Sequence, residues 1–151
     1  MTPDQPEIKF ATSEDIDAIC SMCEDFFKFS PYSTIVSLDS DFIRKRVEHF
    51  IQNGVIVLHI GENGPDGLLV GIVNTALFAD ILMATEAAWW VSEDSRGKGV
   101  STKLLDGFEY WAELMGCKAV CMSSLNTLNV DQILTNRGYT ALEVAYGKVI
   151  S

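Results

Sequence analysis

Two apolar, β-branched runs joined by a short polar turn constrain the fold of this chain more than any other feature. The runs are VIVLHIGE, from Val55, and LLVGIVNTALFA, from Leu68, and the turn between them is NGPDG. A turn rich in Gly, Pro, Asn and Asp between two such runs predicts a β-hairpin. TEAAWWVS, from Thr85, predicts a further strand. The centre of the chain is therefore predicted to form an antiparallel meander.

Helical spacing flanks this meander on both sides. Apolar residues recur at three- and four-residue steps after Ser13, from about Ser40 to Gln52, and from Val100 to Met115. EIKFAT predicts an opening strand, whereas KAVCMSSL, NVDQILTNRG and YTALEVAYGKVI predict a strand, a short helix and a closing strand. The predicted order is β-α-α-β-β-β-α-β-α-β. This is an α/β (α+β) arrangement with a mixed sheet, and it is not a doubly wound nucleotide-binding fold.

Size and composition restrict the class of protein. The 151 residues fit one domain, 1–151, and no apolar run approaches the roughly 18 residues of a membrane-spanning helix. The first residues lack the pattern of a secretory signal, so we expect a cytoplasmic protein. The net charge of −10 opposes binding to nucleic acid and favours cationic partners. Four cysteines lack the spacing of a metal or redox site, and we expect buried free thiols at Cys20, Cys23, Cys117 and Cys121.

The segment SRGKGVS, residues 95–101, lies between a predicted strand and a predicted helix. A turn at a helix N-terminus presents free amides and the positive end of the helix dipole, which together favour an anion. Gly97 and Gly99 allow close approach and positive φ, while Arg96 and Lys98 add charge, so a phosphate group is the expected ligand. The spacings of a Walker loop and of the dinucleotide fingerprint are both missing. The alternative is an ordinary glycine-containing turn before a helix.

Arg96-x-x-Gly99-x-Ser101, with Val91 five positions before the arginine, resembles motif A of the GNAT superfamily of acetyl-CoA-dependent N-acyltransferases. The pattern of that motif is [QR]-x-x-G-x-[GA], so Ser101 stands where Gly or Ala is usual. IKFATSEDIDAI, LLVGIV and ILTNRGY resemble further elements of the family, and the similarity covers essentially the whole chain. The compact length and the segment EDFFKFSPYSTIV resemble small bacterial or bacteriophage members, whose location would be the bacterial or host cytoplasm.

The resemblance implies that acetyl-CoA is the co-substrate and that no metal is needed. The amides of residues 96–101 would surround its pyrophosphate. The strand backbone near Trp90 would bind pantetheine where that strand splays from KAVCMSSL. Two asparagines would contact the cofactor arm, or would only cap a helix. The expected cofactor-binding residues are Trp90, Val91, Arg96, Gly97, Lys98, Gly99, Val100, Ser101, Asn126 and Asn129.

Four further residues are candidates for catalysis and for acceptor binding. Glu86 occupies the strand position where several GNAT enzymes place a base, and its alternative is a solvated charge. Leu134 stands at the position of the family's frequent catalytic tyrosine, so Tyr146 is a candidate proton donor, with core or edge packing as its alternative. Glu24 and Tyr32 are candidates for the acceptor site. Their alternatives are an exposed helix face and a loop aromatic.

The predicted function is transfer of acetyl from acetyl-CoA to a primary amine by direct attack in a ternary complex. The acceptor would be a small molecule, a protein lysine or a protein N-terminus. One alternative, indicated by Leu134, is a catalytically weak acyl-CoA-binding protein that acts through a protein partner. Another is a phosphate-binding domain unrelated to coenzyme A. The resemblance also leaves room for a homodimer, since GNAT proteins often dimerise.

Overall fold

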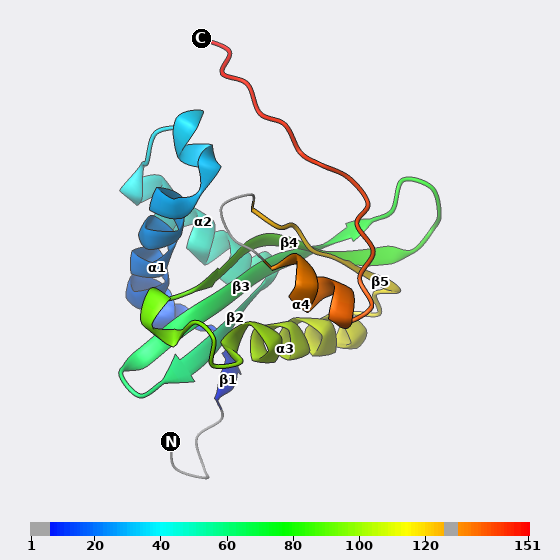
Figure 1. Cartoon of the computed structure of the whole chain (residues 1–151), viewed down its shortest axis with the longest axis horizontal. Helices are drawn as coiled ribbons and strands as arrows, with labels where there is room; N and C mark the ends of the chain where they lie inside the picture. Colours follow the sequence, from blue (N-terminus) through cyan, green and yellow to red (C-terminus); the bar gives the residue numbers. More distant parts are fainter. Residues whose placement is uncertain (1–6, 126–129) are drawn as a thin grey trace.

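The computed structural model describes residues 7–125 and 130–151, which form a mixed sheet with helices on both faces (Figure 1). The strands are β1 (Ile8–Phe10), β2 (Val55–Gly61), β3 (Gly64–Thr75), β4 (Leu82–Val91) and β5 (Ala119–Cys121). The helices are α1 (Ile16–Phe29), α2 (Ser40–Asn53), α3 (Val100–Leu114) and α4 (Asp131–Asn136). Short 3-10 turns are η1 (Ser13–Asp15), η2 (Pro31–Thr34) and η3 (Glu93–Ser95).

The strands follow one another across the sheet in the order β1-β2-β3-β4-β5. Strands β1 to β4 pair antiparallel, as the predicted meander requires, and β5 pairs parallel to β4 after the crossover through α3. The predicted mixed sheet is therefore confirmed. The hairpin turn is tighter than expected, because β2 ends at Gly61 and β3 already begins at Gly64. Most of the NGPDG segment thus belongs to a strand. No helix of the described ranges is long and apolar enough to cross a membrane.

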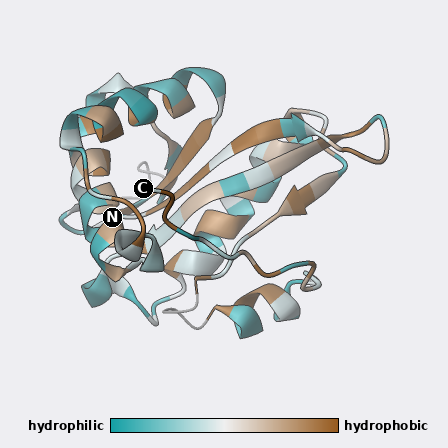
Figure 2. Ribbon diagram, turned by 90° about the horizontal axis from the view of Figure 1, so that it is seen from above, coloured by the Kyte–Doolittle hydropathy of each residue, from teal (hydrophilic) through white to brown (hydrophobic). Residues whose placement is uncertain are grey.

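Each face of the sheet carries its own hydrophobic core. Residues of α1 and α2 pack against one face, and residues of α3 and α4 pack against the other. Figure 2 shows the strands, rich in apolar residues, lying between the helices. In α3, Leu104, Leu105 and Phe108 are fully buried, and each contributes about 1.5–3 kcal/mol of burial free energy. Gly71 lets the Phe108 ring lie on the backbone of β3, since a Cβ atom there would come within 2.3 Å of that ring.

Strand β4 changes its pairing near its middle. Val70 of β3 pairs with Ala88, but the next residue, Gly71, pairs with Glu86, so Ala87 forms a β-bulge. On the other side, β5 pairs with β4 only at residues 83–85. Beyond that point, and within the described residues, β4 has no strand on its β5 side. A gap in the strand pairing between β4 and the described chain after β5 therefore begins next to the bulge.

The closing strand expected over YTALEVAYGKVI is absent from the structure. Residues 139–151 have no regular secondary structure, and the chain runs away from the sheet (Figure 1). Leu142, Val144 and Ile150 of this segment are exposed. Alternating β-branched residues form a strand only where a neighbour accepts their backbone hydrogen bonds, and β5 offers an edge of three residues. The predicted order is thus correct as far as α4 and wrong for the last strand.

Candidate functional site

The glycine turn joins β4 through η3 to α3, and its backbone requires glycine at two positions. Gly97 has φ 78° and Gly99 has φ 80°, in the left-handed region that side chains rarely adopt. Gly99 is the N-cap of α3, whose first internal hydrogen bond runs from the Lys103 amide to the Gly99 carbonyl at 3.2 Å. The amides of residues 100–102 precede that bond and have no acceptor inside the helix. The turn therefore presents free N–H groups, as the sequence predicted.

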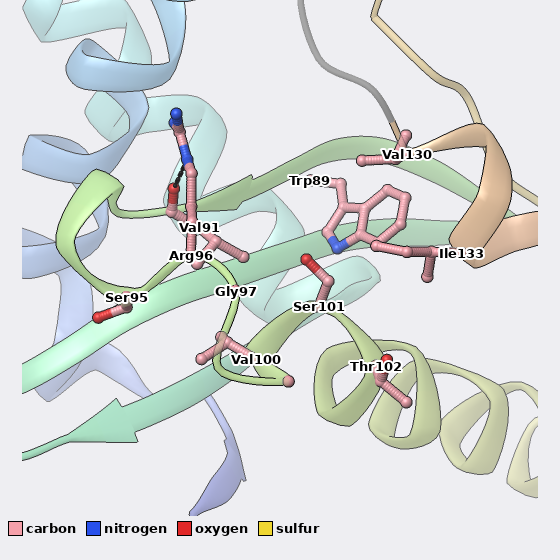
Figure 3. Close-up of a pocket in the computed structure, with 11 residues that line it drawn as sticks. Trp89, Val91, Ser95, Arg96, Gly97, Val100, Ser101, Thr102, Val130 and Ile133 are labelled. Atoms are coloured by element: carbon pink, nitrogen blue, oxygen red, sulfur yellow. Dashed lines mark hydrogen bonds between the residues drawn. The ribbon is translucent and has the colours of Figure 1, made fainter.

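A pocket of about 260 Å³ opens beside these amides. Strand β4 forms one wall, the first turn of α3 forms another, and Val130 and Ile133 of the α4 region close a third side (Figure 3). Its lining residues are Trp89, Val91, Ser95, Arg96, Gly97, Gly99, Val100, Ser101, Thr102, Val130 and Ile133. Free amides and hydroxyls on one side and apolar walls on the other suit a ligand with a phosphate group and an apolar arm.

Most of the residues expected to hold the cofactor meet at this pocket. The lining includes Val91 and the turn from Arg96 to Ser101, except for Lys98, which is exposed. The side chain of Trp90 lies on the opposite face of β4, where its ring packs against Phe26 and Phe29. Asn126 and Asn129 lie outside the described residues.

Arg96 contributes to the turn in a way that the sequence did not predict. Its Nε donates a hydrogen bond to the Val91 carbonyl at 3.0 Å. Its guanidinium lies over the rings of Trp90, at 4.5 Å, and Phe29, at 5.1 Å. Figure 3 shows the guanidinium pointing away from the labelled pocket residues. The arginine thus attaches the turn to β4 and α1, and its guanidinium is directed away from the free amides of the turn.

A buried polar network beneath the turn was also missed. Asp66 of β3 accepts a hydrogen bond from the Ser95 hydroxyl at 2.7 Å, and its carbonyl accepts one from the Ser92 amide at 2.8 Å. The other oxygen of the Asp66 carboxyl lies 2.5 Å from Nδ1 of His59, a side chain that is 7% exposed. The sequence placed Asp66 in a turn and His59 in a strand, and it indicated no hydrogen-bond partner for either side chain. Their sequence separation from Ser95 hides the contact, and only the β3–β4 pairing brings them together.

Glu86 lies between the last β4–β5 pair, at Thr85, and the bulge at Ala87. Burial raises the pKa of its carboxyl group to about 7, although hydrogen bonds from the backbone and side chain of Ser123 act in the opposite direction. Ser123 belongs to the chain just after β5, so the carboxyl group lies at the gap between the two diverging segments. A solvated charge, the alternative for Glu86, does not fit this environment. A carboxyl group with such a pKa exchanges its proton near neutral pH, as a general base must.

Glu86 is not among the lining residues of the pocket, and the other three candidate residues also lie away from it. Glu24 accepts a hydrogen bond from the Ser40 hydroxyl at 2.8 Å, which links α1 to the start of α2. Tyr32 is 53% exposed in η2, and Tyr146 is 93% exposed on the C-terminal segment. None of the three candidates lines the pocket.

Leu134 packs with the α3 core, so no phenol is present at that position. The nearby phenol of Tyr139 is already engaged, since its hydroxyl donates to Glu109 at 2.8 Å. Burial and this carboxylate raise the pKa of Tyr139 well above its usual range, which keeps the hydroxyl protonated. Arg137 also binds Glu109, at 2.6 Å. These contacts attach the end of α4 to α3 and leave the Tyr139 hydroxyl in a structural role.

A mixed sheet in which the pairing of β4 with the edge strand β5 ends early, and in which β4 leads into a glycine turn at a helix N-terminus, defines a class of α/β domain that can hold a phosphate-bearing ligand. The chain belongs to the GNAT acetyltransferase family, since the model of the acetyltransferase (GNAT) family matches residues 20–133. The sequence resemblance to this family is thereby confirmed. A comparison with curated protein sequences finds no match.

Solved structures share the fold. A GNAT family acetyltransferase from Staphylococcus aureus superposes with a TM-score of 0.71 at 18% identity, covering 95% of this chain and 97% of that one. A ribosomal-protein-alanine N-acetyltransferase from Brucella melitensis gives 0.73 at 14% identity, covering 96% and 100%. AAC(6')-Iy in complex with a bisubstrate analogue, CoA-S-monomethyl-acetylneamine, gives 0.77 at 11% identity, covering 95% and 97%. At identities this low, the similarity shows a shared fold and nothing beyond it.

Proposed function

We propose that this protein is a cytoplasmic, acetyl-CoA-dependent N-acetyltransferase that acylates a primary amine by direct attack in a ternary complex. The observation that carries this proposal is the position of Glu86. Its carboxyl group, with a pKa of about 7, lies at the gap between β4 and the chain after β5. Three residues further along β4, Trp89 lines the pocket at the glycine turn. The proposed base thus lies on β4, and the pocket beside the glycine turn lies at the end of the same strand.

The donor would bind along this strand. Its diphosphate would accept hydrogen bonds from the free amides of the turn and of the first residues of α3. Its pantetheine arm would follow β4 toward the bulge, where the strand backbone lacks a β5 partner and can pair with the amides of the arm. The thioester would then reach the neighbourhood of Glu86. The coenzyme A analogue carried by AAC(6')-Iy, a protein of the same fold, supports this assignment of the donor.

The acyl transfer would need one proton acceptor. As the amine nitrogen attacks the thioester carbonyl, a C–N bond forms and the C–S bond breaks. The amine would first lose its extra proton to solvent, because only the neutral form can attack. The Glu86 carboxylate would accept the second proton that the nitrogen loses on acylation, directly or through water, and the thiolate would leave and be protonated from solvent. Because thiolates are good leaving groups, a leucine at position 134 is compatible with turnover.

The acceptor is proposed only as a class. An excess of 21 acidic over 11 basic residues supports an amine that is cationic in solution, such as a small polyamine-like molecule, a protein lysine or a protein N-terminus. Leu134 favours the second candidate function, an acyl-CoA-binding protein with weak catalysis that acts through a partner.

The experiment that separates these functions combines thiol release with coenzyme A binding. Acetyl-CoA is incubated with the protein and a panel of small amines, N-terminal peptides and lysine peptides, and free thiol is measured. Release above the background rate with at least one amine is the expected result. Binding of coenzyme A without release from any amine would support the binding protein. No thermal stabilisation by coenzyme A would contradict both functions.

A further inference from the structure

Trp89 carries an unused hydrogen-bond donor at the wall of the pocket. Its side chain is 7% exposed, and its Nε1 has no hydrogen-bond partner in the described part of the chain. Figure 3 shows the Nε1 edge of the indole turned toward Ser101 and the first turn of α3. Buried indole N–H groups usually find an acceptor, because leaving the donor unpaired is unfavourable. The acceptor for this group is therefore expected to come from a bound molecule.

The surroundings of Nε1 indicate which kind of acceptor fits. Ser101 is the second residue of α3, and its hydroxyl lines the pocket beside the helix amides that lack an internal acceptor. The positive end of the helix dipole adds to these donors, so the donors face one region that favours an anion. Val91, Val130 and Ile133 supply apolar walls around it. In such surroundings, a hydrogen bond to a charged oxygen is stronger than in water.

We propose that Trp89 Nε1 and the Ser101 hydroxyl donate hydrogen bonds to oxygens of the diphosphate of the bound acyl-CoA. This inference rests on the proposed function, and it adds two side-chain donors to the main-chain amides of the turn. It also gives a role to the serine that stands where the family motif has Gly or Ala. The indole thereby acts as a positioning group, which fixes the diphosphate on β4 and aligns the arm with the gap at Glu86.

The test replaces the indole by a ring without an N–H group. Trp89→Phe keeps an aromatic wall and removes the donor. Trp111→Phe is the matched control, because Trp111 lies in the same core, is similarly buried at 8% exposure, and does not line the pocket. The Kd of each variant for coenzyme A is measured by calorimetry. Trp89→Phe is expected to bind about tenfold or more weakly, the effect of one hydrogen bond to a charged group, and Trp111→Phe within about twofold of the original.

Fragments of the donor identify the group that receives the bond. ADP contains the diphosphate without pantetheine, and pantetheine lacks the diphosphate. Trp89→Phe should weaken ADP by the same factor as coenzyme A and leave pantetheine unchanged. A loss confined to pantetheine would overturn the assignment to the diphosphate. Equal coenzyme A affinity in Trp89→Phe and the original protein would overturn the inference as a whole, whereas an original protein that fails to bind coenzyme A would contradict the proposed function instead.

Ser101→Ala provides a second test that does not depend on the folding of the tryptophan variant. Alanine is an accepted residue of the motif and a good helix former, so the variant should fold normally. Its affinity for ADP is expected to fall severalfold, with unchanged thermal unfolding. Unchanged ADP affinity would remove the hydroxyl from the site and overturn the two-donor arrangement.

Discussion

The glycine turn and the region formed by residues 30–39 and 140–151 differ in how firmly they are held. The turn is held by the hydrogen bond from the Ser95 hydroxyl to Asp66 and by the one from Arg96 to the Val91 carbonyl of β4. Its end is fixed because Gly99 is the N-cap of α3. The second region is exposed to solvent. Tyr32 and Val36 are more than half exposed, and its two segments come close to each other where Gly147 lies beside Ile35. A fixed turn suits one invariant ligand. Under the proposed function, the fixed turn would hold the donor and the exposed region would receive the acceptor.

The largest effect is expected from Gly99→Glu. Residue 99 has φ 80°, so any side chain is strained there, and a carboxylate at the N-cap would repel a phosphate. We expect coenzyme A affinity to fall at least a hundredfold by calorimetry, while the region formed by residues 30–39 and 140–151 keeps its structure. Gly116→Glu is the matched control, since Gly116 has φ 78° after the other end of α3 and does not line the pocket. Equal losses in both variants would mean that strain, and not phosphate binding, causes the effect.

The next largest effect is expected from Glu86→Gln. The pKa of about 7 means that the carboxyl group is protonated below neutrality and accepts a proton above it. kcat/KM of the original protein should therefore rise with pH through about 7. The variant should lose this rise and be about 100-fold slower at pH 8, the usual size of a general-base contribution. Matching pH profiles would remove Glu86 from the mechanism.

The same residue makes a prediction about stability. Because burial raises the folded-state pKa above the ordinary value of 4.5, the folded state binds more protons than the unfolded state between pH 4.5 and 7. The free energy of unfolding should therefore decrease as pH rises through this interval. In Glu86→Gln that part of the decrease should vanish, as measured by urea unfolding at several pH values. An equal or steeper decrease in the variant would contradict the assigned environment.

A smaller effect is expected from Asp66→Asn, which tests whether the contacts of Asp66 with Ser95 and His59 hold the turn in place. The amide keeps the volume but weakens the bond to Ser95 and removes the carboxyl oxygen that faces Nδ1 of buried His59. We expect a loss of about 1–3 kcal/mol in the free energy of unfolding, with weaker coenzyme A binding. Asp94→Asn, an exposed residue of η3, should change neither quantity. Coenzyme A affinity that stays constant in Asp66→Asn would show that the turn holds its shape without this network.

The sequence predicted the parts of the molecule that depend on local periodicity and on backbone conformation. Helical spacing located the four helices, and the two glycines located the turn, because those patterns act within a few residues. The contact of Asp66 with Ser95 spans 29 residues and has no local pattern. The direction of the Arg96 side chain was not predicted either, because nothing local says which way a long side chain points. The prediction of a closing strand was wrong because a local pattern was present where the required neighbour was missing. Residues 139–150 alternate as a strand does, but a strand also needs a neighbour, and periodicity cannot supply one.

The smallest effect is expected from Tyr146→Phe. The residue was a candidate proton donor, yet its side chain is 93% exposed and does not line the pocket. A phenol in water has no fixed position relative to the leaving thiolate, and thiolates leave without an acid, so kcat/KM should change by less than about twofold with any amine that serves as acceptor. Tyr139→Phe is the informative companion, because its hydroxyl donates to Glu109 between α4 and α3 and its loss should lower the unfolding temperature without altering the pH profile of kcat. A tenfold loss of kcat in Tyr146→Phe, with unchanged coenzyme A affinity, would show that the C-terminal segment folds over the acceptor during turnover. The exposed region would then be part of the catalytic machinery and not only a surface for recognition.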